Sequence, residues 1–486
     1  MLLPECLEDY ISETNPVRCI DAFVEKLSAT GDESALPPQR EMDAAGGRIG
    51  YSPQTFAKLF IWGYINRVRS TRRLETEAGR NLELIWLLGK LQPDHSSISR
   101  FRKSNPECIK RWLKEFNLIC AQLNLFGAEE ISIDGVYLKA VNSKRNNYTQ
   151  AKLEKRLAKL QTKVDAYLHE LEQSEADEAP NEEITDIKAK IAQLEDATQK
   201  AKEMLKASES SPTGQHSTTD SDARLLTKRT TPGSAVVGYL AQSAVDSKTH
   251  LIAATEATQK SDDSGQLTPM AKAALEGMGQ EQPVEQPPAK QDVSTLENAP
   301  KAPRILADGG YFQINDLAAS ERAGFEPWVP PNQESKARAG LYPTSDFHYD
   351  EKHDSYHCPQ KKELTRHSDS TTKGNTYQAY YNTRACRDCP VRAKCTTGRY
   401  RKINRHCEEA TVQRMRERMD KKPEMYKNRA ATVEHPFGSM MFWNEGRNLL
   451  CKGLEMANAE FSLSALAYNF KRTLNVVGIN ALLEAI

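Results

Sequence analysis

The chain has 486 residues, of which 38% are hydrophobic and 27% are charged. Its length exceeds what one compact core usually holds, so we expect two to four domains. No apolar run approaches the roughly 18 residues of a membrane span, and the first residues do not resemble a secretory signal. The composition therefore predicts a cytoplasmic protein without a membrane partner, in which the ten cysteines are thiols or metal ligands rather than disulfides.

The net charge of zero conceals a strong asymmetry along the chain. Residues 67–114 contain 12 Lys/Arg against 5 Asp/Glu, and residues 384–429 contain 15 against 6. Between them, residues 170–206 contain 5 against 11. Two basic blocks separated by an acidic one indicate a polyanion partner held at two places. The alternative is that each block is simply a solvated set of helix faces.

The sequence pattern of residues 1–125 predicts an all-helical N-terminal domain. Ser52-Pro53 supplies a cap and a proline at the first helical position. Further helices are expected at 71–78, at 82–88, after the Asp94 cap and from Pro106 onward. Arg72 and Arg73 at the edge of a short helix fit a DNA-contacting or dimerising module, and a plain helical scaffold is the open alternative.

Residues 126–148 contain the first core strand, in the apolar run 131–138. The pattern is typical of a central strand covered on both faces. Asp134 interrupts this run, and a buried carboxylate costs free energy unless a charged partner sits against it. Two interpretations remain open from these residues alone: a hairpin turn at Asp134-Gly135, or a metal ligand.

Residues 149–206 predict an insertion made of two heptad-patterned helices. Leu153, Leu157, Leu160 and Val164 step by four and three residues, and the pattern resumes after a polar break. The pattern is typical of an antiparallel coiled-coil hairpin with a structural or dimerising role.

Residues 207–335 predict the main part of an α/β core. Residues 207–233 are expected as loop, and the strands 235–245 and 250–255 as an antiparallel pair. A helix at 269–278 and a linker lead to the strand 304–307, which ends at Asp308. A helix at 313–323 and a short extended segment at 325–329 follow.

Residues 336–407 predict a cysteine-rich insertion, and residues 408–486 predict C-terminal helices that complete the core. A C-x₂-C pair with two further cysteines is the pattern of a closed structural zinc site. The four expected ligands are Cys358, Cys386, Cys389 and Cys395. The alternative is a small subdomain packed around reduced thiols.

Without the two insertions, the order of strands and helices suits a mixed sheet flanked by helices, of ribonuclease H-like type. In open α/β sheets ligands gather at the carboxyl ends of strands, where Asp308 is expected. Glu434 lies near the start of a later helix. Three carboxylates from separate elements can hold two Mg²⁺ or Mn²⁺ ions, which hard oxygen ligands select.

Several motifs, taken together, resemble bacterial insertion-sequence transposases of the DDE type. The front end resembles the InsH-like N-terminal domain of that group, through 51–53, 70–75, 93–95 and 100–102. The core and tail are similar through 133–135, 237–246, 306–311, 433–438, 460–463 and 465–469.

This resemblance implies an acidic triad of Asp134, Asp308 and Glu434. It also implies a Tyr-Arg-Glu signature, in which Tyr426 and Arg429 precede Glu434 and Arg429 holds a DNA phosphate near the metals. Related chains carry a lysine seven residues after the glutamate, where this chain has Met441. Arg447 or Lys452 is the expected compensation.

The predicted function is therefore that of a DNA transposase. It is expected to bind the terminal inverted repeats of its element as a homodimer on nucleoid DNA. Hydrolysis of a phosphodiester bond would free a 3′-hydroxyl, which then attacks target DNA. Two alternatives stay open: a Mg²⁺-dependent nuclease without strand transfer, and a decayed copy that binds DNA without catalysis.

Overall fold

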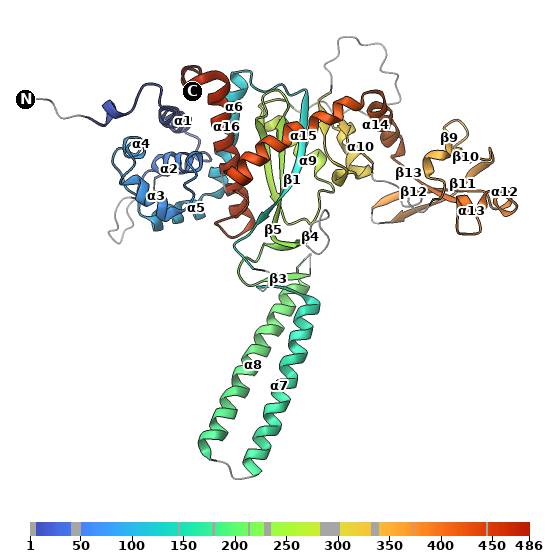
Figure 1. Cartoon of the computed structure of the whole chain (residues 1–486), viewed down its shortest axis with the longest axis horizontal. Helices are drawn as coiled ribbons and strands as arrows, with labels where there is room; N and C mark the ends of the chain where they lie inside the picture. Colours follow the sequence, from blue (N-terminus) through green and yellow to red (C-terminus); the bar gives the residue numbers. More distant parts are fainter. Residues whose placement is uncertain are drawn as a thin grey trace, which may run out of the picture.

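A computed structural model describes ten segments of the chain. These are residues 6–39, 50–143, 146–176, 180–211, 214–227, 235–281, 302–331, 340–372, 374–443 and 446–486. No helix in these segments is long and apolar enough to cross a membrane. The chain combines an N-terminal helical region with a sheet-containing C-terminal region (Figure 1).

The N-terminal region is helical, as predicted. Ser52 accepts a hydrogen bond from the Thr55 amide and starts its helix, and Asp94 caps the later helix through the amides of Ser96 and Ser97. Its elements are η1 (Leu7–Tyr10), α1 (Val17–Ala29), α2 (Pro53–Ile65), α3 (Thr71–Ala78), α4 (Leu82–Leu87), α5 (His95–Ser104) and α6 (Pro106–Gln122).

A mixed six-stranded sheet forms the centre of the molecule. Its strands are β1 (Glu130–Lys139), β4 (Arg224–Thr227), β5 (Ala235–Asp246), β6 (Ile252–Thr258), β7 (Arg304–Leu306) and β8 (Glu326–Trp328). The order is β4-β5-β1-β7-β8, with β6 also paired to β5. β5 runs antiparallel to β1, β4 and β6, whereas β7 is parallel to both β1 and β8. Because β1 lies inside the sheet and Asp134 within the strand, Asp134-Gly135 is not a hairpin turn.

Helices flank this sheet. They are α9 (Leu267–Gly277), α10 (Ile314–Arg322), α14 (Glu409–Lys421), α15 (Pro423–Gly438) and α16 (Leu454–Ala485), with η3 (Gly309–Tyr311) and a π-helical turn η5 (Ser439–Trp443) between them. In Figure 1, α15 crosses in front of β1. The expected helices at 408–420, 428–441 and 455–474 are thus present, with α15 beginning earlier, at a proline in its first position.

The buried asparagines of α16 hold the helix against the sheet. The side chain of Asn458 accepts from the Ala257 amide and donates to its carbonyl, and Asn469 does the same at Ile252. Both partners lie on β6, which pairs only with β5 among the strands that the structure describes. The two side chains therefore satisfy backbone groups that an edge strand otherwise leaves open.

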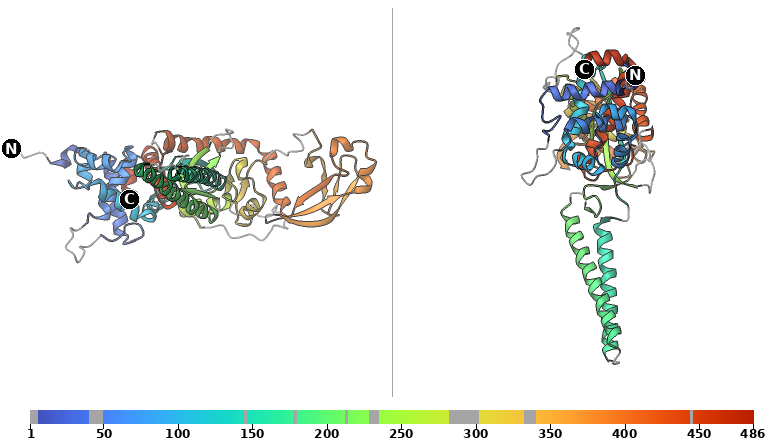
Figure 2. Two further views of the ribbon diagram at one scale, coloured as in Figure 1. Left: turned by 90° about the horizontal axis from the view of Figure 1, so that it is seen from below. Right: turned by 90° about the vertical axis from the view of Figure 1, so that its left-hand side faces the viewer.

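Two long helices form the hairpin that the heptad pattern predicted. α7 (Gln150–Ala176) and α8 (Asn181–Glu209) lie side by side and project from the core (Figure 2, right). Leu153, Val164, Ile187 and Ile191 are buried between them. The short strands β2 (Asn147–Thr149) and β3 (Gln215–Ser217) pair at the base of this hairpin.

The cysteine-rich region folds around a second sheet, which the sequence pattern does not predict. Its five strands have the order β13-β12-β11-β10-β9, with short helices beside them. This sheet lies at the opposite end of the molecule from the N-terminal helices (Figure 2, left). The elements are η4 (Thr344–Asp346), β9 (His348–Asp350), β10 (Ser355–His357), β11 (Glu363–Thr372), β12 (Asn375–Tyr381), α12 (Thr383–Arg387), α13 (Arg392–Cys395) and β13 (Lys402–His406).

The prediction of a loop over residues 207–233 is wrong for much of the described part of this range. α8 continues to Glu209, and β3 and β4 occupy much of the described part of this segment. Leu226 is buried where β4 pairs antiparallel with β5, so sheet pairing outweighs the polar composition around it. Most of the linker expected before Pro303 lies outside the described residues.

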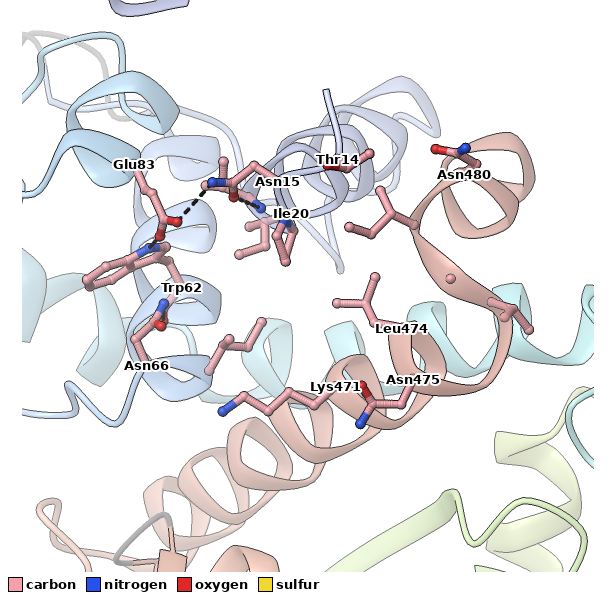
Figure 3. Close-up of a pocket in the computed structure, with 16 residues that line it drawn as sticks. Thr14, Asn15, Ile20, Trp62, Asn66, Glu83, Lys471, Leu474, Asn475 and Asn480 are labelled. Atoms are coloured by element: carbon pink, nitrogen blue, oxygen red, sulfur yellow. Dashed lines mark hydrogen bonds between the residues drawn. The ribbon is translucent and has the colours of Figure 1, made fainter. Parts of the chain in front are cut away.

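A cavity of about 770 Å³ lies where the N-terminal helices meet α16 (Figure 3). Glu83 accepts hydrogen bonds from Asn15 and from the Trp62 indole on one side of it. Lys471 projects from α16 on another side, and burial lowers its pKa. The cavity lies between elements other than those that carry Asp134 and Asp308.

Candidate active site

Asp134 lies within β1, and Asp308 lies just beyond the end of the neighbouring parallel strand β7. Ser132 of β1 pairs with Leu306, the last residue of β7. Both aspartates approach the same guanidinium, that of Arg429, so they lie close together. The Asp308 carboxylate also accepts a hydrogen bond from the Gly310 amide and caps η3. The sheet therefore brings together two acids separated by most of the core sequence.

Arg429 of α15 is the cation that faces this pair. Its Nη2 atom lies 3.2 Å from Oδ2 of Asp134 and 3.9 Å from Oδ2 of Asp308. The guanidinium is largely buried, and its Nε atom has no hydrogen-bond partner in the described part of the chain. One positive charge thus faces two carboxylates, of which that of Asp134 is largely buried and that of Asp308 is 48% exposed.

Burial dominates the electrostatics of Asp134. Burial raises the pKa of this carboxyl to about 6, against the lowering effects of Arg429 and the Gly135 amide. The neighbouring Asp308 and Asp263 raise the pKa further. The ionised form is therefore disfavoured in the metal-free protein, which is the condition under which a bound cation is most stabilising.

This shift predicts a pH dependence of stability in a chelating buffer. A folded-state pKa raised from 3.8 to about 6 means that the protonated group stabilises the fold at low pH. That contribution is lost as the pH rises between about 4 and 6. The Asp134→Asn variant should therefore gain up to about 2–3 kcal/mol over the parent at pH 7.5, and little at pH 4. Urea denaturation at both pH values checks this, and an equal difference at both would contradict it.

Asp263 is a third carboxylate at this site, which the sequence analysis missed. Its Oδ1 accepts a hydrogen bond from Gln242 Nε2 at 2.8 Å. A Cβ atom on Gly135 would lie 2.5 Å from Oδ1, and one on Gly310 would lie 3.0 Å from Oδ2. The glycines that follow Asp134 and Asp308 thus leave the space that the Asp263 carboxylate occupies.

A sequence signal for Asp263 did exist. β6 runs in the same direction as β1, so the loop after β6 returns to the edge of the sheet that carries Asp308. The segment Asp262-Asp263-Ser264-Gly265 is also typical of a turn, however. Its composition is therefore explained without a role for Asp263 at the site. Gln242 further connects the loop to the site, since its Oε1 accepts a hydrogen bond from the Tyr311 hydroxyl.

Glu434 lies on α15 but is exposed. It follows Arg429 by five residues, so the two side chains leave the helix in directions about 140° apart. Tyr426 lies on the same helix and is half-buried, and its pKa is raised by burial and by the nearby aspartates. The structure therefore places Tyr426 and Arg429 at the paired aspartates, whereas Glu434 is exposed on the same helix.

The other expected DNA-binding residues are on the surface. Arg72 and Arg73 are exposed on α3, and Arg447 is exposed above the Phe442 ring. Arg69, by contrast, is buried in an ion pair with Glu460 of α16 and is structural. Met441 is also buried, so its side chain packs into the core.

The four cysteines of the expected zinc site line one small cavity of about 30 Å³. Burial raises the pKa of the Cys395 thiol, and the nearby Cys358, Cys386 and Cys389 raise it further. Within the segments that the structure describes, however, no group of three or more Cys, His, Asp or Glu side chains is arranged to hold a metal ion. This holds for the thiols and for the aspartates alike, so both metal sites remain predictions.

Comparisons with protein families match both ends of the chain. A model described as a transposase domain (DUF772) matches residues 5–104, and one described as a transposase DDE domain matches residues 357–474. The second range contains Tyr426, Arg429 and Glu434. No curated protein and no solved structure matches the chain. The two family models, matched at the two ends of the chain, support an insertion-sequence transposase of the DDE type.

Proposed function

We propose that the chain cuts DNA at the ends of its element by metal-dependent hydrolysis and joins the freed 3′-hydroxyl to target DNA. The observation that carries this proposal is the approach of Asp134, on β1, and Asp308, just after the parallel strand β7, to one arginine, Arg429. The mixed sheet, with β1 between an antiparallel and a parallel neighbour, supports a ribonuclease H-like core. Folds of this kind present ligands at the carboxyl ends of their parallel strands.

The donor atoms at the paired aspartates fit a hard divalent cation. Asp134 and Asp308 supply carboxylate oxygens, which Mg²⁺ and Mn²⁺ prefer over softer ligands. A divalent ion bound there activates water and stabilises the leaving oxygen of a phosphodiester. Asp134 and Asp308 would hold such ions, and Asp263 keeps Gln242 in place beside them.

Glu434 would complete the triad after a change in α15. Because Arg429 and Glu434 point about 140° apart, they do not face the aspartates together. We infer that, with cations at Asp134 and Asp308, the Arg429 guanidinium would be free to bind a DNA phosphate. Glu434 would join the two aspartates there if α15 rotates about its axis.

A strand-transfer assay tests the proposal. The parent is supplied with pre-cut duplexes that carry the terminal repeats of the element, supercoiled target DNA and Mg²⁺. Integrated products are expected. Cleavage of uncut ends without integration would instead identify a nuclease, and binding without either product would identify a decayed copy.

One observation supports the alternative that the chain is a decayed copy without catalysis. Where related chains carry a lysine, Met441 is buried and offers no charge to DNA. Arg447 is exposed nearby and would supply the missing contact. An Arg447→Gln variant that loses strand transfer while the parent performs it would support this compensation.

The cysteine cavity supports a structural zinc site, which metal analysis tests. Protein purified without chelator is expected to carry one zinc ion per chain. Cys386→Ser should remove this zinc and loosen the second sheet, since zinc thiolates contribute directly to folding. Cys451→Ser, at a cysteine outside the cavity, is the control and should keep its zinc. Zinc-free parent protein with an intact fold would contradict the site.

The partners follow from this function. Terminal inverted repeats and target DNA are the proposed ligands, and two subunits on DNA would supply one catalytic site for each end. The proposed location is the bacterial cytoplasm, at the nucleoid.

A further inference from the structure

One face of the projecting hairpin carries a row of cations near its base. We call it the basic stripe: Lys152, Lys155, Arg156, Lys159 and Lys163 of α7. At about 100° per residue, these five side chains leave the helix within an arc of about 100°. They extend over about 17 Å of helix. An open hollow of about 610 Å³ follows this face and is lined by all five.

The charge of the hairpin reverses along its length. Residues 150–163 contain five Lys/Arg and one Glu, whereas residues 164–176 contain four Asp/Glu and no Lys/Arg. On α8, residues 181–196 near the tip contain five Asp/Glu and two Lys. Figure 1 shows that the hairpin joins the core at the start of α7 and the end of α8. The cations are therefore gathered at the end of the hairpin that joins the core, and the tip is acidic.

The stripe is exposed, and much of its charge is uncompensated. Lys155, Lys159 and Lys163 are exposed and make no ion pair within the described residues. Lysines nearer the tip are different, because Lys188 pairs with Glu175 at 2.9 Å and Lys190 pairs with Asp186 at 2.6 Å.

An aromatic side chain orders the base of the stripe. The Arg156 guanidinium donates to the Tyr148 hydroxyl at 3.1 Å, and the Lys152 ammonium lies 4.6 Å from the centre of the Tyr148 ring. Tyr148 thus fixes two of the cations, which reduces the entropy lost when they bind an anion.

The stripe is connected to the paired aspartates through β1. This strand continues for five residues from Asp134 to Lys139, about 17 Å, and residues 140–149, which include β2, then lead to α7. Lys139 is exposed, and its amide donates to the Arg447 carbonyl at 2.8 Å. Two exposed cations, Lys139 and Arg447, therefore lie together at the end of β1 that leads to the hairpin. A duplex carries one phosphate charge per about 1.7 Å of axis, so its backbone can follow such a path.

We propose that the basic stripe binds the phosphate backbone of duplex DNA whose reacting bond lies at Asp134 and Asp308. This inference rests on the proposed function of that site. It gives the hairpin a role as a DNA-holding arm that reads no sequence, since lysine contacts to phosphate carry no base information. The competing occupant is the acidic tip of a hairpin in a second copy of the chain.

Two triple variants with the same change in net charge test the proposal. The stripe variant is Lys155→Gln, Lys159→Gln and Lys163→Gln, and the control is Lys188→Gln, Lys190→Gln and Lys200→Gln in the same hairpin. The probe is a fluorescein-labelled mixed-sequence duplex, titrated by anisotropy at several salt concentrations. The stripe variant should bind at least about tenfold more weakly at low salt, and its plot of log K against log salt should be shallower by about 2–3. The control should match the parent.

Each other result has a definite meaning. Equal affinities and salt slopes for the two triple variants would overturn the proposal. A stripe variant that binds DNA normally but changes the sedimentation of the free protein would assign the surface to a second copy. Parent protein that binds the duplex through the stripe yet neither cuts nor joins DNA would refute the proposed function alone. If the parent joins DNA and both triple variants bind and join DNA as the parent does, this inference alone would be refuted.

Discussion

Replacing Asp134 by Asn is expected to abolish Mg²⁺-dependent DNA cleavage while the protein still folds and binds DNA. The substitution removes one of the two carboxylates proposed to hold the metal and leaves the volume of the side chain almost unchanged. A cation that activates water contributes several kcal/mol to the transition state, and each 1.36 kcal/mol is a factor of ten. Cleavage of a labelled duplex should therefore fall by at least about 10³-fold.

The same loss is expected for Asp308→Asn and for Glu434→Gln. Asp196→Asn on α8 is the matched control, because it removes one carboxylate charge from an exposed helix far along the hairpin. Cleavage by Asp134→Asn at a rate near that of the parent would remove this site from the reaction. Loss in the aspartate variants with full activity in Glu434→Gln would exclude Glu434 and make Asp263 the next carboxylate to substitute.

Among the substitutions proposed for this protein, Glu460→Ala is expected to lower the free energy of unfolding the most. Glu460 is almost fully buried, pairs with Arg69, and accepts hydrogen bonds from the amides of Leu450 and Cys451. Its loss removes the carboxylate that faces the buried Arg69 guanidinium, which still donates to the Asn448 carbonyl. Breaking one side of a buried ion pair costs about 3–5 kcal/mol, measurable by urea denaturation.

Glu25→Ala is the control for this prediction. Glu25 pairs with Lys58 at 2.7 Å, but its side chain is 60% exposed, so the loss should stay below about 1 kcal/mol. Equal losses in the two variants would mean that the Arg69–Glu460 pair does not tie α16 to the N-terminal region. A double variant, Arg69→Met with Glu460→Leu, should recover much of the stability, because apolar residues of similar size can replace a buried ion pair.

Local patterns predicted most helices and core strands. The capped helices of the N-terminal region, the strand at Asp134 and the antiparallel pair after it are present near the expected bounds. These elements have strong apolar periodicity or clear caps. The second sheet was missed because its strands are polar: along β11 only Leu364 is buried, so no alternation of apolar residues marks the strand.

The site was predictable as far as strand register determines it. Asp134 and Asp308 could be expected together because parallel strands align their carboxyl ends. The approach of Arg429 to both, and the outward direction of Glu434, depend on how α15 packs across β1, which no local pattern specifies. Asp263 depends on the path of a loop and on two glycines that leave it space. These contacts are tertiary, and sequence spacing alone does not reveal them.

Whether Asp134 and Asp308 hold the metal ions can be seen in a crystal structure of the protein with a cleaved end duplex and Mn²⁺, through the anomalous signal of manganese. We expect strong peaks within about 2.2 Å of carboxylate oxygens of Asp134 and Asp308, with Glu434 turned toward them and Arg429 on a phosphate. A complex that holds DNA but shows no manganese at these aspartates, with Arg429 still between them, would contradict the account.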